Sequence, residues 1–68
     1  MGKSNYVHLE DCEIIEVRDT AINILWDGTK YWLPTSQVAD PETFKNGDNG
    51  VTVSITEWIA REKGIEDS

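Results

Sequence analysis

Two side chains of this chain belong to the types that act as base and nucleophile in enzymes: His8, the single histidine, and Cys12, the single cysteine. Both stand at even positions, so on one extended strand their side chains would share a face. Nucleophilic catalysis requires such a base beside a nucleophile. However, His8 lies near the chain start and no further catalytic group accompanies the pair, which favours a small apolar role for Cys12. We therefore expect no catalytic residues, and we expect the chain not to be an enzyme.

Carboxylates are concentrated between residues 10 and 19, where Arg18 is the only basic residue. The acidic residues of this stretch are Glu10, Asp11, Glu13, Glu16 and Asp19. On the edge of a sheet, such charges protect an exposed strand against aggregation. Alternatively, together with Asp27 further along the chain, they present a row of negative charge that resembles a row of phosphates to a basic groove.

Metal and phosphate sites are not indicated. Asp48-Asn49-Gly50 resembles a fragment of a calcium-binding loop, but no acidic residue follows at the required spacing. Met1-Gly2-Lys3-Ser4 resembles half of a phosphate-binding loop, without its first glycine or a preceding strand. We expect neither a metal nor a cofactor.

Charge and length limit the function further. The 68 residues suffice for one small domain, residues 1–68, and we expect residues 1–5 and 66–68 to be disordered. Six Lys and Arg against thirteen Asp and Glu give a net charge of −7, which disfavours binding to duplex DNA and favours a basic protein partner. A lone cysteine and the lack of a transmembrane stretch or signal peptide predict a soluble, cytoplasmic protein.

The elements that must position these groups begin with a β-hairpin over residues 22–34. With Asp27-Gly28 as a two-residue turn, Trp26 faces Thr29; with Gly28-Thr29 as the turn, Trp26 faces Tyr31. Both registers place the same side chains on one face, namely Ile22, Ile24, Trp26, Tyr31 and Leu33. Leu25 and Trp32 fall on the other face, so Trp32 is either covered by the C-terminal helix or exposed as a binding anchor.

The remaining elements follow from periodicity and turn residues. Residues 6–9 are a short edge strand or a packed lead-in, and residues 12–18 form a strand in which Ile15 and Val17 share a face opposite Ile14. A short turn or 3₁₀ segment is expected over residues 35–39 and a brief helical turn over residues 40–44, before a strand over residues 51–56. A helix then runs from about Thr56 to Lys63, capped by Thr56 or Ser54 and closed by Gly64.

This order predicts a mainly β (α+β) fold. We expect a small, strongly bent antiparallel sheet, or an SH3-like or OB-like barrel, of four or five strands with a C-terminal helix. Trp26, Tyr31 and Trp58 are assigned to the core. Trp58 and Ile59 are expected to pack the helix on the sheet.

Several segments resemble short phage and prophage proteins of unassigned role, over roughly residues 12–65. The likeness lies in Trp32-Leu33-Pro34-Thr35-Ser36-Gln37, which matches a W-x-P-x-S-Q segment, and in Glu57–Gly64, which matches a terminal E-W-hydrophobic-A-x-x-K-G helix. The resemblance implies a phage context and no catalytic residues. Small acidic phage proteins include anti-CRISPR proteins, several of which resemble DNA in charge.

The sequence thus predicts a non-catalytic, acidic protein-binding module, of which the most concrete form is a phage-encoded inhibitor acting in the host cytoplasm. Its contact residues would be Glu10, Asp11, Glu13, Glu16, Asp19, Asp27 and Trp32. The alternative is a single-stranded nucleic-acid-binding accessory domain that uses Trp32 and Lys30, since exposed aromatic residues stack bases. An exposed Trp32 is also compatible with a homodimer contact.

Overall fold

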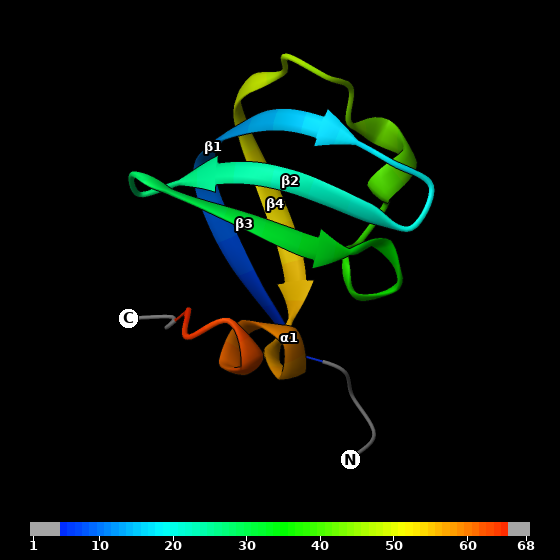
Figure 1. Ribbon diagram of the computed structural model, residues 1–68. Helices are drawn as coiled ribbons and strands as arrows, with labels where there is room; N and C mark the ends of the chain where they lie inside the picture. The colour runs from blue at the N-terminus through cyan, green and yellow to red at the C-terminus, as the bar shows by residue number, and fades with distance from the viewer. Residues whose placement is uncertain (1–4, 66–68) are drawn as a thin grey trace.

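The computed structural model describes residues 5–65, which form a four-stranded antiparallel sheet followed by a short helix (Figure 1). The strand order across the sheet is β3-β2-β1-β4. The elements are β1 (Tyr6–Val17), β2 (Ala21–Trp26), β3 (Thr29–Pro34), the 3₁₀ turns η1 (Thr35–Gln37) and η2 (Pro41–Thr43), β4 (Asn49–Thr56) and α1 (Glu57–Glu62). The predicted mainly β class is confirmed, and so are the two helical turns after β3.

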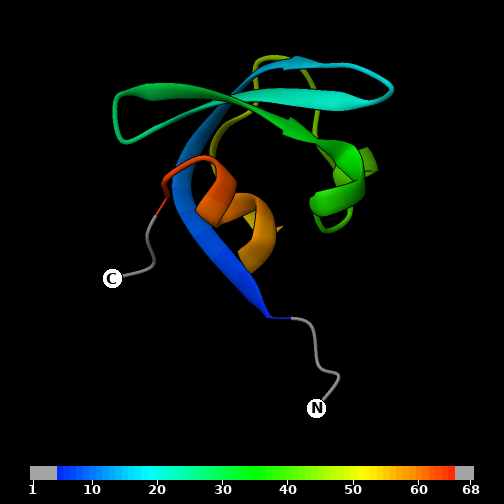
Figure 2. The ribbon, with the colours of Figure 1, turned by 60° about the horizontal axis from the view of Figure 1, so that its bottom comes forward.

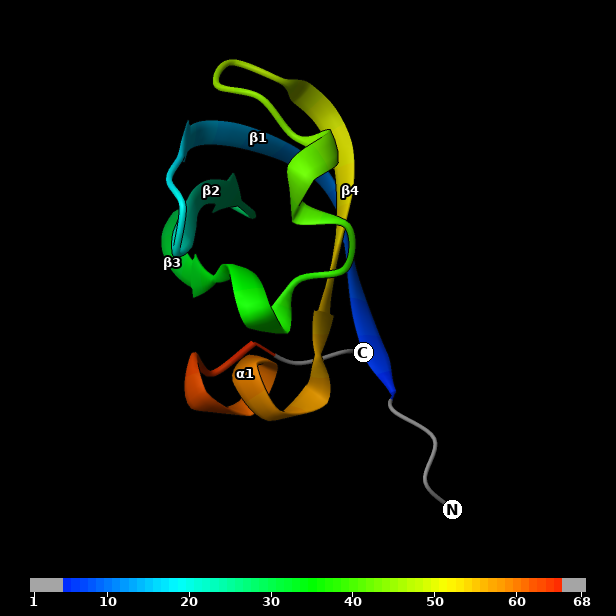
Figure 3. The ribbon, with the colours of Figure 1, turned by 90° about the vertical axis from the view of Figure 1, so that its right-hand side faces the viewer.

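The sheet is curved but not closed into a barrel (Figure 3). β3 and β4 are its two edges, and one isolated bridge between Val38 and Ile55 joins the segment after β3 to β4. Pairing cannot continue along that segment as a ladder, because Pro34 ends β3 and η1 turns the chain away. Of the two predicted architectures, the bent sheet is therefore the observed one.

The first strand differs from its prediction, because residues 6–17 form one continuous strand at the centre of the sheet. Its pairing register shifts between Leu9 and Cys12, and again between Ile14 and Glu16. Such bulges insert an extra residue and bend the strand. Ile14 is fully buried, and after the second shift Val17 packs against the same core. The prediction that Val17 shares a face with Ile15, opposite Ile14, is therefore wrong.

The hairpin confirms the first of the two registers. Trp26 lies opposite Thr29, and Asp27 and Gly28 form the turn with φ values of 52° and 76°. Positive φ at both central residues defines a type I′ turn, whose twist matches that of the flanking strands. Ile22 and Ile24 are fully buried.

The C-terminal helix is defined by its caps. Thr56 Oγ1 accepts a hydrogen bond from the Ile59 amide at 3.3 Å, which confirms Thr56 as the N-cap. At the other end Gly64 has φ 74°, and the Ile65 amide donates to the Ala60 carbonyl at 2.8 Å. Together with the bond from the Gly64 amide to Arg61 at 3.1 Å, this is the Schellman arrangement predicted for Gly64.

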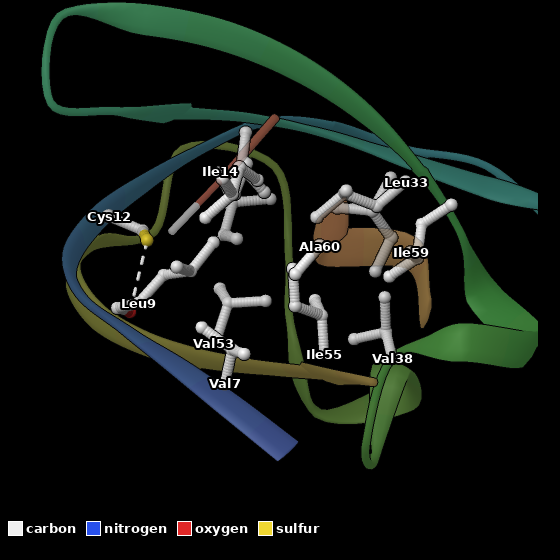
Figure 4. Packing of buried hydrophobic residues seen from close by; sticks show 13 residues of the cluster. Val7, Leu9, Cys12, Ile14, Leu33, Val38, Val53, Ile55, Ile59 and Ala60 are labelled. Atoms are coloured by element: carbon white, nitrogen blue, oxygen red, sulfur yellow. Dashed lines mark hydrogen bonds between the residues drawn. The ribbon is translucent and has the colours of Figure 1, made fainter. Parts of the chain in front are cut away.

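The core lies between the concave face of the sheet, the segment around Val38 and α1, whose Ile59 and Ala60 face the other core side chains (Figures 2 and 4). No charged side chain of residues 5–65 is buried. Ile59, Ala60 and Ile65 attach the helix, whereas Trp58 is 60% exposed, so its assignment to the core is wrong. A helix of six residues buries only one narrow face, and Ile59 occupies it.

The disorder expected at residues 1–4 and 66–68 concerns positions outside the described residues. Asn5, which was included in that expectation, accepts a backbone hydrogen bond from Glu57 at 3.2 Å. The start of β1 is thereby fastened to the start of α1.

Candidate binding surfaces

Cys12 and His8 do not form a pair. Cys12 is fully buried and its thiol donates to the Leu9 carbonyl at 3.2 Å, whereas His8 is exposed and its Nδ1 lies 2.6 Å from Ser54 Oγ. The bulge between Leu9 and Cys12 breaks the alternation that would place both on one face of an extended strand, and the buried position of Cys12 agrees with the small apolar role expected for it. Burial raises the pKa of Cys12 to about 11, which keeps the thiol protonated and unreactive at neutral pH.

The contact of His8 with Ser54 joins an imidazole to a hydroxyl, which is two parts of a hydrolytic triad. No carboxylate in residues 5–65 hydrogen-bonds to this histidine. Among the described residues, the imidazole has no third group of the kind that orients the base in such sites.

The predicted acidic residues do not form one row. β1 pairs with β4 over residues 6–13 and with β2 over residues 13–17, and the two parts meet at a bend, so its carboxylates do not follow one straight line. The bulges turn successive side chains in different directions. The structure instead divides these acidic residues between two ends of the sheet.

The first group lies where β1 bends beside the tip of the β2–β3 hairpin (Figure 1). We call it the acidic bend and define it by Glu10, Asp11, Glu13 and Asp27. Glu13 pairs with Leu25, and Asp27 follows two residues later in the turn. Asp11 adopts φ 60° inside the bulge and is exposed, as are Glu10 and Asp27. None of the four forms an ion pair with another residue of 5–65.

The other two acidic residues lie away from the bend. Glu16 is neutralised by Arg18, whose Nε donates to its carboxylate at 2.7 Å in the only ion pair among residues 5–65. Asp19 belongs to the β1–β2 turn, at the opposite end of the sheet. There it lines a pocket of about 270 Å³, whose other lining residues are Val17, Arg18, Thr35, Pro41 and Glu42.

Trp32 is exposed, which decides between the two predicted positions for it. Its side chain is 40% accessible on the convex face of the sheet, and α1 does not cover it. The guanidinium carbon of Arg18 lies 5.0 Å from the ring centroid, within the range of a cation–π contact. Arg18 therefore links Glu16, by an ion pair, to Trp32, by a cation–π contact.

Asn23 pairs directly with Trp32 in the hairpin register. Its Oδ1 is buried without a hydrogen-bond partner in residues 5–65. The two-residue turn could have indicated the Asn23–Trp32 contact from sequence. The approach of Arg18 could not be predicted, because it depends on the bulge between Ile14 and Glu16.

Within residues 5–65, no group of three or more His, Cys, Asp or Glu is arranged to hold a metal ion. The α-helix of this part of the chain has six residues, and no candidate membrane-spanning helix is found there. Comparison of the chain with protein-family models, curated proteins and solved structures finds no match.

Proposed function

We propose that the protein is a non-catalytic acidic binding module whose acidic bend docks on a basic, nucleic-acid-binding surface of another protein. The observation that carries the proposal is the gathering of Glu10, Asp11, Glu13 and Asp27 at one end of the sheet, without cationic partners among residues 5–65. Its most concrete form is a phage-encoded inhibitor of anti-CRISPR type, acting in the host cytoplasm, as the resemblance to phage and prophage proteins implies.

Electrostatics supports this choice of partner. Two unit charges about 8 Å apart interact with only about 0.5 kcal/mol in water, so one exposed carboxylate contributes little. Several unpaired carboxylates facing a basic groove act together, and complementary fields raise the association rate as well as the affinity. The net charge of −7 adds a long-range attraction of the whole protein to a basic surface.

The rigid presentation of these charges is the second support. Asp27 lies in a type I′ turn and Asp11 in a bulge, so both backbones are fixed by the sheet. A partner would therefore meet the carboxylates without ordering a flexible segment, which reduces the entropic cost of binding.

The test uses a panel of purified CRISPR effector complexes and measures their binding to target duplex DNA by gel shift, with and without this protein. We expect inhibition of at least one effector. The double variant Glu10→Lys/Glu13→Lys should weaken that inhibition tenfold or more, because it replaces two carboxylates of the acidic bend by cations.

The matched control is Asp19→Lys/Glu42→Lys, which changes the net charge by the same +4, from −7 to −3, at the opposite end of the sheet. It should inhibit nearly as well as the wild-type protein. If both double variants lose inhibition equally, net charge and not the acidic bend is responsible. If the wild type inhibits no effector, the anti-CRISPR form of the proposal is wrong.

A second candidate rests on the exposed Trp32, which shares its face with Lys30 and Arg18. An aromatic ring with neighbouring cations can stack a base of single-stranded nucleic acid. Titration with a dT12 oligonucleotide at physiological salt, followed by tryptophan fluorescence, tests it. Quenching that disappears in Trp32→Phe would support this candidate, and an unchanged spectrum would reject it.

A further inference from the structure

The outer edge of β3 carries backbone groups that have no partner among residues 5–65. In a hairpin closed by a two-residue type I′ turn, the residues that flank the turn exchange hydrogen bonds with each other, and hydrogen-bonded pairs alternate from there. Trp26–Thr29, Ile24–Tyr31 and Ile22–Leu33 are therefore the bonded pairs of this hairpin. The amides and carbonyls of Lys30 and Trp32 consequently point away from β2.

No segment of residues 5–65 covers that edge. β3 is the last strand of the sheet, and the backbone hydrogen bonds made outside the strands and helices involve neither Lys30 nor Trp32. Pro34, the next residue of the same phase, has no amide hydrogen to offer. On the free edge, Lys30 and Trp32 thus present two donors and two acceptors, flanked by Pro34 at one end and the hairpin turn at the other.

We propose that this edge pairs with the same edge of a second copy of the chain, so that two β3 strands lie antiparallel about a two-fold axis at Tyr31. A second copy fits because the edge is self-complementary in this register. The amide of Lys30 donates to the carbonyl of Trp32 in the second copy, and the amide of that Trp32 donates to the carbonyl of Lys30. The symmetric pair repeats both bonds, so all four groups of each strand are satisfied.

Two-fold axes at the neighbouring residues Lys30 and Trp32 would give a less stable pairing of the two β3 strands. An axis at Lys30 places two ammonium groups directly opposite each other, and like charges in that position are destabilising. An axis at Trp32 brings Lys30 opposite Pro34 of the second copy, so the Lys30 carbonyl finds no donor. Only the axis at Tyr31 avoids both defects.

Charge complementarity favours a second copy at the same place. In the Tyr31 register each Lys30 side chain lies on the convex face directly beside Trp32 of the other copy. Trp32 is 40% exposed, and it already attracts one cation, Arg18, at 5.0 Å from its ring. A second cation next to the exposed part of the ring adds a contact of the same kind. The acidic bends come to lie at opposite ends of the joined sheet, which limits their mutual repulsion.

Cysteine scanning along β3 tests both the pairing and its register. Residues opposite each other in a non-hydrogen-bonded pair have Cα atoms about 4.5 Å apart, within the range of a disulfide. Under mild oxidation, Tyr31→Cys should give a covalent dimer on a non-reducing gel, whereas Lys30→Cys and Trp32→Cys should not. Residue 30 lies opposite residue 32 of the second copy, so the two Cα atoms of residue 30, like those of residue 32, are farther apart than the roughly 7 Å that a disulfide can bridge. Wild type is the control, because its single Cys12 is buried.

Sedimentation equilibrium on the full chain gives an independent measurement. The wild type should dimerise with increasing protein concentration, and more strongly at higher salt, since each copy carries −7. Lys30→Pro removes one outward amide from each copy and should weaken the dimer about tenfold or more. Like the native Pro34, the new proline lies in β3 at a position whose amide points outward, and thermal unfolding verifies that the variant folds. Lys30→Thr keeps the amide and should weaken the dimer less.

Three results would overturn the proposal. A monomer at every concentration would mean that Lys30 and Pro34 guard the edge against pairing. Cross-linking at residue 30 or 32 in place of 31 would place the axis elsewhere. A dimer that Lys30→Pro leaves unchanged would use a different surface.

Discussion

Raising the pH should destabilise this protein through the buried thiol of Cys12. The side chain is fully buried beside Leu9, and this burial is the main reason why its pKa rises from 9.0 to about 11. The nearby charge of Asp11 adds to the rise, while a backbone hydrogen bond from Val53 opposes it. Alkaline pH therefore acts on one identifiable group of the core.

The sign follows from the two protonation equilibria. Below pH 9 the thiol is protonated in both the folded and the unfolded chain, so its ionisation does not change the free energy of unfolding. Between pH 9 and about 11 the unfolded chain loses the proton while the folded chain keeps it, so the unfolded state is stabilised. Stability is thus lost as the pH rises through this window, and the loss ends above the folded pKa.

The magnitude follows from the same two values. A shift of one pKa unit corresponds to about 1.4 kcal/mol, so a rise of this size removes about 2–3 kcal/mol of unfolding free energy by pH 11. A domain of this length has on the order of 3–10 kcal/mol in total. The effect is therefore large enough to move a denaturation midpoint visibly.

The assay is urea unfolding of wild type and Cys12→Ala between pH 7 and pH 11, followed by far-UV circular dichroism. Effects of pH that are common to both proteins cancel in their difference. The stability advantage of wild type over the variant should be constant up to about pH 8 and then fall by about 2–3 kcal/mol. A difference that stays flat to pH 11, or rapid labelling of the native thiol by an aromatic disulfide reagent at pH 8, would refute the reasoning.

Two predictions concern the fold that carries the binding surfaces. Ile24→Ala, at a fully buried position, should cost about 2–5 kcal/mol in urea unfolding, whereas Leu25→Ala on the half-exposed convex face should cost less than half as much; equal losses would contradict the assigned faces. Gly64→Ala should lower stability by about 1 kcal/mol in thermal unfolding, because its φ of 74° disfavours any Cβ although nothing lies within 4 Å of it; a neutral result would argue against the helix end described.

The local elements were the most predictable part of the fold. The register of the hairpin, the two 3₁₀ turns and both caps of α1 follow from residues within a few positions of one another, such as Asp27-Gly28 and Lys63-Gly64-Ile65. Turn and cap geometries are determined by backbone preferences and nearby hydrogen bonds, which a sequence pattern records directly.

The path of β1 was not predictable in the same way. Its two bulges interrupt the alternation that the sequence pattern assumes; one lies where β1 pairs with β4 and the other where it pairs with β2. That pairing separates Cys12 from His8 and brings Arg18 over Trp32. These outcomes depend on partners distant in sequence, and no local pattern encodes them.

The sequence alone determined the mainly β character, the hairpin, the capped helix and the strongly negative charge, because composition, period and turn chemistry are properties of short segments. Only the tertiary structure decided where the charge lies and which aromatic rings meet solvent. It gathered Glu10, Asp11, Glu13 and Asp27 at one bend, set Asp19 apart, and left Trp32 and Trp58 exposed. The physical reason is that surface position depends on which strands become neighbours and which face of a short helix the core has room to bury.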